Sequence, residues 1–237
     1  DTNNRALGVT GLARLDGSSE SNDRGTHARL RVRNSPAAPD FECDSLQIAG
    51  GSYVEGMSAP TMIVNGQVVI YDNGALVGSG TFSSAGLIAS SGTIQPSNGD
   101  LSISATGGSN IDLDGSGSGE ILLTFPGSDL TISANALTDA FDGYLFFDQS
   151  VDFTFWTVQP WEVGPAGQLR VGSPATTGRE ATIQGSPMTF RGMAEVLGAD
   201  NVLHFDAAET TVSESAQFDV SADSMIVFDS DTTIDGG

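Results

Sequence analysis

An oxygen-rich run from Asp112 to Glu120 is the part of the sequence best suited to bind a metal ion. Carboxylates and hydroxyls alternate in it with Leu or Gly, a pattern that suits Ca²⁺ because this ion takes about six to eight hard oxygen ligands. Leu123 stands where an EF-hand has its last carboxylate, and the flanks read as strands, so the run is not an EF-hand. Two interpretations stay open, a polar β-turn and a calcium site, whose ligands would be Asp112, Asp114, Ser116, Ser118 and Glu120.

Aromatic residues gather in a second candidate site between Phe141 and Trp161. Exposed aromatics make good anchors, so the block predicts either a stacking platform for sugars or an interface with a neighbouring subunit. The alternative is a plug of the core, because Phe153 and Phe155 alternate with polar residues and should point inward. Three side chains remain as candidate ligand-binding groups: Tyr144, Trp156 and Trp161.

Catalysis finds little support in the sequence. The two histidines, His27 and His204, are far apart, and neither has the spacing of a metal-binding motif. No nucleophile elbow, Cys-His pair or phosphate loop occurs in the sequence. Cys43 is the only cysteine, so no internal disulfide forms, and a small buried hydrophobic residue is the ordinary role of such a cysteine. We therefore expect a binding or structural role.

Charge is the most unusual bulk property of the chain. Its formal net charge is −21, and all nine basic residues are Arg. This balance repels nucleic acid and anionic lipid, and no stretch has the ~20 apolar residues that a membrane span needs. Three arginines, Arg29, Arg31 and Arg33, should share the outward side of one strand as the only strongly positive strip. Acidic residues near the other end, Asp229 and Asp231 among them, are its natural complement, so the sequence predicts self-association from head to tail.

Short apolar-polar alternations, separated by Gly, Asn, Asp or Ser, must position all of these residues. A period of two predicts strands with one buried side, and nothing comparable occurs at the helical period over ten residues. Two short stretches, 136–141 and 192–197, are compatible with single helical turns at corners. The positions expected to point inward include these: Leu30, Val32, Leu46, Ile48, Ile63, Val68, Ile70, Leu101, Ile103, Ile111, Leu113, Leu130, Ile132, Val151, Phe153, Phe155, Leu169, Val171, Phe218, Val220, Ile226 and Phe228.

The number of these runs favours an all-β parallel β-helix (β-solenoid) with coils of about 20–25 residues. Recurring Phe-Asp steps fit this fold, with a stacked inner aromatic followed by an outward carboxylate. The alternative is a set of antiparallel β-sandwich domains, because Asn-Gly pairs at 65–66, 73–74 and 98–99 favour hairpins. We divide the chain into a polar entry (1–45), a solenoid body with the aromatic block (46–165) and a continuation (166–237).

The segment 86–105, GLIASSGTIQPSNGDLSISA, resembles the coils of autotransporter-type and haemagglutinin-like bacterial surface proteins. The resemblance rests on GTIQP at 92–96 and GDLSI at 99–103. It implies a right-handed parallel β-helix at the cell surface, used as a stalk, adhesin or assembly unit. The chain begins without Met, so we expect it to be a segment or mature piece of a longer polypeptide. The aromatic block and the Arg-rich start depart from the family pattern.

The expectation from the sequence is an extracellular, structural or adhesive β-solenoid segment of a filament or stalk. It would act through self-association or passive binding to neighbouring segments, without nucleic acid and without membrane insertion. The alternative is a β-helix that binds or cleaves carbohydrate, with polysaccharide as its partner. Paired carboxylates such as Asp148 and Asp152 can occur anywhere in so acidic a chain, so they do not identify catalytic residues for hydrolysis. Calcium is the one cofactor that the sequence suggests.

Overall fold

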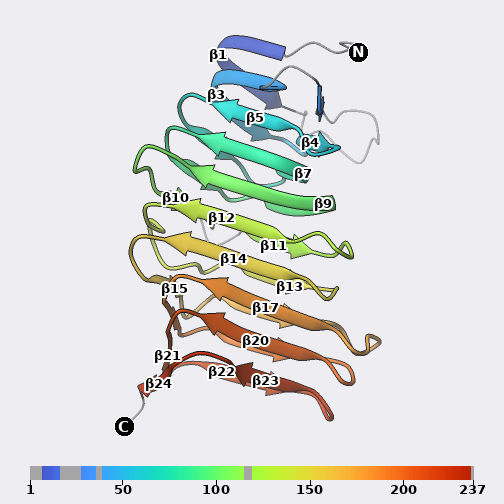
Figure 1. Cartoon of the computed structure of the whole chain (residues 1–237), viewed down its shortest axis with the longest axis vertical. Helices are drawn as coiled ribbons and strands as arrows, with labels where there is room; N and C mark the ends of the chain where they lie inside the picture. The colour runs from blue at the N-terminus through green and yellow to red at the C-terminus, as the bar shows by residue number, and fades with distance from the viewer. Residues whose placement is uncertain (1–6, 17–27, 36–38, 115–118, 236–237) are drawn as a thin grey trace.

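The chain forms a β-solenoid of about nine turns in which every strand pairing between the described strands is parallel. The structure is a computed structural model and describes residues 7–16, 28–35, 39–114 and 119–235. β1 lies at one end of the long axis and β24 at the other (Figure 1). Tyr144 pairs in register with Gln168, and Gln168 with Met193, so these coils take 24 and 25 residues. The predicted parallel solenoid is confirmed, and the antiparallel sandwich is wrong.

Each coil crosses three faces, which the strand pairings define. The first face holds β2 (Arg29–Arg33), β4 (Tyr53–Met57), the starts of β7 (Ala75–Ser84) and β9 (Thr93–Ala105), β11 (Glu120–Leu123), β13 (Tyr144–Phe147), β16 (Gln168–Val171), β19 (Met193–Val196) and β22 (Gln217–Val220).

The second face continues from the first around the corner of each coil and points towards the viewer in Figure 1. It holds the starts of β1 (Leu7–Asp16) and β3 (Phe41–Ala49), β5 (Thr61–Val64), the ends of β7 and β9, β12 (Leu130–Ala134), β14 (Asp152–Thr157), β17 (Glu180–Gly185), β20 (Val202–Ala207) and β23 (Met225–Phe228).

The third face closes the coil and is the least regular. It holds the ends of β1 and β3, β6 (Val68–Ile70), β8 (Ile88–Ser90), β10 (Ile111–Asp112), β15 (Trp161–Val163), β18 (Met188–Phe190), β21 (Thr210–Ser213) and β24 (Thr232–Asp235). Two isolated bridges, Ile111 to Leu137 and Phe141 to Val163, continue the face between β10 and β15.

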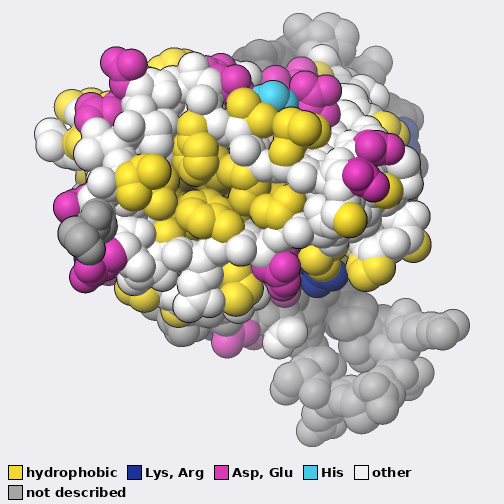
Figure 2. Space-filling model, turned by 90° about the horizontal axis from the view of Figure 1, so that it is seen from below, with side chains coloured by type: hydrophobic (Ala, Val, Ile, Leu, Met, Phe, Trp, Pro, Cys, Tyr) yellow, Lys and Arg dark blue, Asp and Glu magenta, His cyan; other side chains and the backbone are white. Residues whose placement is uncertain are grey.

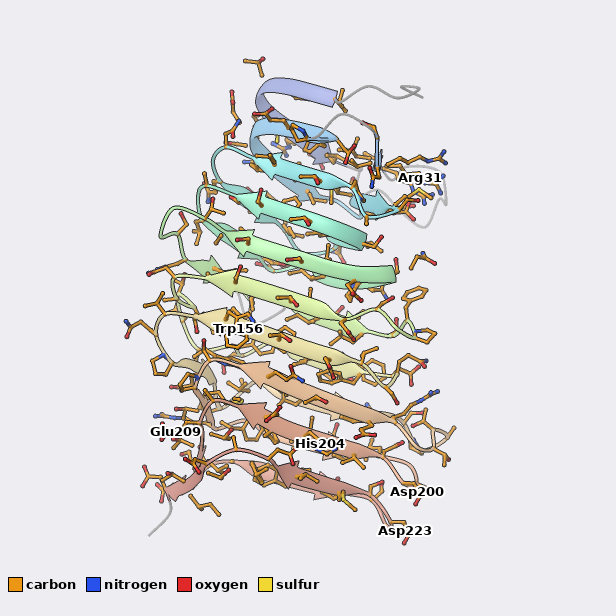
Figure 3. The ribbon with its side chains drawn as sticks, in the orientation of Figure 1. Arg31, Trp156, Asp200, His204, Glu209 and Asp223 are labelled. Atoms are coloured by element: carbon orange, nitrogen blue, oxygen red, sulfur yellow. The ribbon has the colours of Figure 1, made fainter. Side chains whose placement is uncertain are left out.

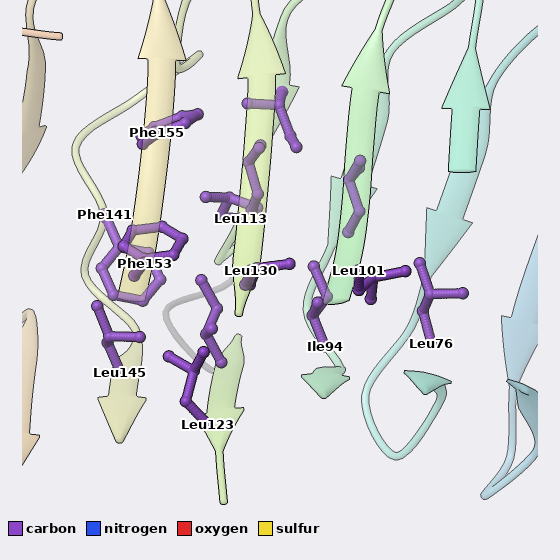
Figure 4. Close-up of a cluster of buried hydrophobic side chains, with 14 of the residues drawn as sticks. Leu76, Ile94, Leu101, Leu113, Leu123, Leu130, Phe141, Leu145, Phe153 and Phe155 are labelled. Carbon is purple, nitrogen blue, oxygen red and sulfur yellow. The ribbon is translucent and has the colours of Figure 1, made fainter. Parts of the chain in front are cut away.

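The core is a stack of apolar side chains from successive coils, which follows from the period-two pattern of the strands. Leu76 pairs with Ile94 in register, and Ile121 joins Ile94 to Leu145, so like side chains lie above one another. Figure 4 shows several of these stacked residues. Further along, the rings of Phe205 and Phe228 from successive coils stack at 5.1 Å. The predicted stacking of inner residues is confirmed.

The structure corrects three details of the sequence-based expectation. Met62 and Val64 are buried on β5 where Ile63 was expected, because the strand begins one position out of the assumed phase. Residues 193–196 form β19, not a helical turn. The Asn-Gly pairs are corners between faces, not hairpins. Asn73 and Asn98 adopt positive φ there, which Asn tolerates better than most residues.

Candidate functional site

The proposed calcium loop connects β10 on the third face to β11 on the first face. Asp112 is the last residue of β10, and its Oδ1 accepts the N–H of Asp114 at 3.3 Å. Glu120 begins β11 and accepts the hydroxyl of Thr93 from the previous coil at 3.3 Å. Ser116 and Ser118 lie outside the described residues. Glu120 and Asp114 thus link this coil to its neighbours, while Asp112 bonds within its own turn, and calcium binding stays a prediction.

Asp114 is the buried carboxyl of the described part of this loop. Burial raises its pKa, and the charges of Asp112 and Asp142 add to this effect, while a hydrogen bond from the Asp142 N–H opposes it. Within the described part of the chain, no three His, Cys, Asp or Glu side chains are grouped so as to hold a metal ion. The chemistry that the geometry shows at Asp114 is that of a carboxylate fixing the backbone of the next coil.

Trp161 is not available as a ligand platform, because it is buried with 3% of its surface exposed. It begins β15 on the third face and points inward, where its ring meets Phe155 edge-on at 5.1 Å and Phe153 at 6.2 Å. Of the two interpretations that the sequence left open for the aromatic block, Trp161 follows the core one, because its proline-bounded segment is a strand of the solenoid wall.

Tyr144 and Trp156 face outward, but on different sides of the solenoid. Tyr144 lies on β13 of the first face, stacks on Phe146 at 5.9 Å and is half-buried, and burial raises the pKa of its phenol against an opposing effect of Arg170. Trp156 lies on β14 of the second face with 52% of its surface exposed (Figure 3). The three predicted aromatics therefore do not form one platform, and Trp156 is the exposed one.

The predicted basic strip faces outward on β2, but much of its charge is compensated within the chain. Glu55, on β4 of the next coil, accepts hydrogen bonds from Arg29 Nε at 3.0 Å and from Arg31 Nε at 2.9 Å. Burial acts to raise the pKa of Glu55, but the hydrogen bonds and charges of Arg29 and Arg31 outweigh it and hold that pKa below its usual value. Arg33 is exposed, and no ion pair of Arg33 forms with a described residue.

The acidic residues predicted to complement the basic strip also have partners within the chain. Asp229 follows β23 and lies 2.5 Å from Nδ1 of His204, whose Nε2 is 3.3 Å from a carboxylate oxygen of Glu180. His204 thus points outward as expected and bridges three successive coils. Asp231 is exposed, and its carbonyl oxygen accepts the N–H of Thr210. His27 lies outside the described residues.

At the β24 end, apolar residues of the solenoid interior are exposed. The sequence predicts that some of these residues point inward, but it does not predict their exposure. Ala194, Val196 and Val212 are buried, but the residues that continue their rows in the last coil, Phe218, Val220 and Ile234, are exposed. A broad apolar patch covers this end in Figure 2. The alternation predicts that Phe218 and Val220 point inward, which is confirmed, but their exposure depends on what covers the coil.

Cys43 is buried on β3, as its expected role as a small hydrophobic residue requires. Burial raises the pKa of its thiol to about 11, and the neighbouring charges of Asp44 and Glu42 act in the same direction. The thiolate is therefore disfavoured, and Cys43 is unsuited to act as a nucleophile in the folded chain.

Comparison with known proteins adds no family to this picture. No protein family model matches the chain, and no curated protein or solved structure was found to be similar to it. Among the described residues, no helix is long and apolar enough to cross a membrane.

Proposed function

We propose that this chain is a structural β-solenoid segment of an extracellular filament, stalk or adhesin, and that it acts through end-to-end self-association. One observation carries the proposal: the interior of the last described coil is open to solvent. Phe218 is 42% exposed and Ile234 75% exposed, although both continue rows whose members in the preceding coil, Ala194 and Val212, are buried. Contiguous apolar patches of this kind mark interaction sites on soluble proteins.

The edge of the last coil offers backbone groups as well as apolar surface. Among the described strands, β22, β23 and β24 each pair with a strand of the preceding coil only, so their outer edges present backbone groups that a further strand can pair with. A second copy that adds β-structure here would cover Phe218, Val220 and Ile234 and continue the parallel stack. The gain is both apolar burial and backbone pairing.

A head-to-tail arrangement is favoured over a tail-to-tail one for two reasons. All described strand pairs are parallel, and only a head-to-tail stack continues that direction. In a tail-to-tail contact, Asp219, Asp229 and Asp231 of both copies would face each other, and like charges repel. A head-to-tail contact instead brings this acidic end towards the end that carries Arg33, and it gives an open filament because the contact does not close on itself.

Light scattering on the whole chain over a concentration and salt series tests the proposal, with Ile234→Asp as the disrupting variant. Val158→Asp is the matched control, because Val158 is 74% exposed on the side of the solenoid, as exposed as Ile234 at its end. We expect the unchanged chain and V158D to form oligomers and I234D to remain monomeric. The proposal is wrong if all three stay monomeric at high concentration, or if V158D and I234D associate equally.

A further inference from the structure

The second face carries an uncharged strip that is separate from the open end. Its outward positions form two rows across five coils, in register from β5 through β7, β9 and β12 to β14. The first row is Thr61, Thr81, Ser102, Thr131 and Thr154, and the second row is Ile63, Ser83, Ser104, Ser133 and Trp156. We call these ten residues the hydroxyl strip.

The absence of charge in the hydroxyl strip is unusual in a chain with a net charge of −21. Carboxylates border it instead: Asp100, Asp129 and Asp152 stand two residues before the first-row members of their coils. These carboxylates also brace the coils, since Asp100 accepts the N–H of Asp129 at 3.1 Å and Asp129 accepts that of Asp152 at 2.9 Å. An anionic partner would be repelled by this border, whereas a neutral partner with hydroxyl groups could donate to it.

Trp156 gives the strip an aromatic anchor. It is directly opposite Ser133 in register, and its neighbour Phe155 is fully buried, so the strand that carries the indole is held by the core. A large aromatic side chain on a rigid strand contributes apolar contact area at low cost in conformational entropy. Figure 3 shows Trp156 on the face towards the viewer, away from both ends of the stack.

The spacing of the strip is periodic in two directions. Neighbouring coils are about 4.8 Å apart in a sheet, and outward side chains along one strand repeat every ~6.7 Å. Rows of hydroxyls at the coil spacing can make repeated hydrogen bonds only with a partner that is itself periodic and extended along the solenoid axis. Aromatic, hydroxyl and carboxylate groups together suit a sugar ring, which has an apolar C–H face and hydroxyls at its rim.

We propose that the second face binds a neutral, extended polysaccharide that lies along the solenoid axis, with one sugar ring stacked on Trp156. The other sugars contact the Thr and Ser hydroxyls of the strip and donate hydrogen bonds to the bordering carboxylates. This site does not rest on end-to-end association, because it lies on the side of the solenoid and uses none of the residues at its end.

The test measures retention of the whole chain on insoluble cellulose and chitin as neutral polymers, with soluble pectate as an anionic one. Trp156→Ala is expected to lower the affinity for a neutral polymer about tenfold or more. Thr131→Glu, which places a charge in the strip, should lower it as well. Tyr71→Ala is the matched control, because Tyr71 is also an exposed aromatic (44%) but lies outside the strip. Melting temperatures of the variants verify that each one folds.

Retention of the unchanged chain and of Y71A, together with loss in W156A and T131E, supports the proposal. It is overturned if the unchanged chain is retained by neither neutral polymer, if it binds pectate instead, or if W156A and Y71A lose affinity equally. The monomeric variant I234D serves as a further control. If I234D is still retained on the neutral polymer, polysaccharide binding by the hydroxyl strip does not depend on self-association. Failure of one proposal is then distinguishable from failure of the other.

Discussion

The imidazole of His204 on β20 lies 2.5 Å, from Nδ1 to Oδ2, from the carboxylate of Asp229 in the last coil. This contact is one of several side-chain links between the final coil and the preceding one, which include the hydrogen bond from the Asn201 N–H to Ser224 and the stacked rings of Phe205 and Phe228. The end of the solenoid is therefore held by a polar clamp on its outer surface as well as by its core.

Removal of that clamp should loosen the last coil. His204→Ala is expected to lower the free energy of unfolding by about 1 kcal/mol, because a hydrogen bond to a charged group is lost. Amide hydrogen exchange should quicken in β23 more than in β9, which lies several coils away. Asp229→Asn is the control that keeps an acceptor for His204. Equal exchange in β23 with and without His204 would contradict the prediction.

Acid should weaken the contact between β2 and β4 through Glu55. The pKa of Glu55 is lowered in the folded chain, so its contribution to stability is complete above the ordinary value of 4.5 and is lost as the pH falls through the lowered pKa. Glu55→Gln is expected to unfold more easily at neutral pH and to show a shallower loss of stability in acid. Urea unfolding at a series of pH values measures both effects.

Glu209→Gln is the matched control for that experiment, because Glu209 is exposed, its backbone oxygen accepts the N–H of Met188, and its carboxylate forms no ion pair with a described residue. Its pH profile should follow that of the unchanged chain. If the profile of Glu55→Gln coincides with the profile of Glu209→Gln, the ion pairs of Glu55 with Arg29 and Arg31 do not stabilise the fold.

Gly185 ends β17 at a close approach of two coils. Its φ is +118°, and a Cβ atom there would lie 2.1 Å from the carbonyl oxygen of Phe155 in the previous coil. Gly185→Ala is therefore expected to cost about 3 kcal/mol or more, or to prevent folding. Gly127→Ala is the control, with φ +62° and open space, and should cost about 1–2 kcal/mol. Circular dichroism and thermal unfolding compare the two, and equal melting temperatures would contradict the prediction.

Calcium should raise the melting temperature only slightly if the loop from Asp112 to Glu120 binds it. A site with a dissociation constant of about 1 mM would add about 1.4 kcal/mol at about 10 mM Ca²⁺ by mass action. A NaCl solution of the same ionic strength is the control. Asp112→Asn should abolish the rise in melting temperature that Ca²⁺ causes. If Ca²⁺ and NaCl give the same melting temperature, the loop is a plain turn.

The alternation of apolar and polar residues determined the fold class. Successive side chains of a strand point to opposite sides, so a strand with one buried side can be recognised from its local sequence alone. Leu101 and Ile103 point inward, and Phe147 is followed by an outward Asp148, as the sequence predicts. At Ile63 the assumed phase of the alternation was wrong, and at Trp161, which lies on a short strand between turn residues, the alternation did not decide between core and surface. Only the packing of the whole coil decided those positions.

Which outward residues become neighbours was decided by the tertiary structure alone. Ala75 pairs with Thr93 and Thr93 with Glu120, so one coil advances by 18 residues and the next by 27. Because corners of different length absorb this variation, no fixed period in the sequence aligns Thr81 with Ser102 or Ser133 with Trp156. The hydroxyl strip, the compensation of the arginines by Glu55 and the open interior at Ile234 exist only after the coils have stacked, because backbone pairing between coils sets their register.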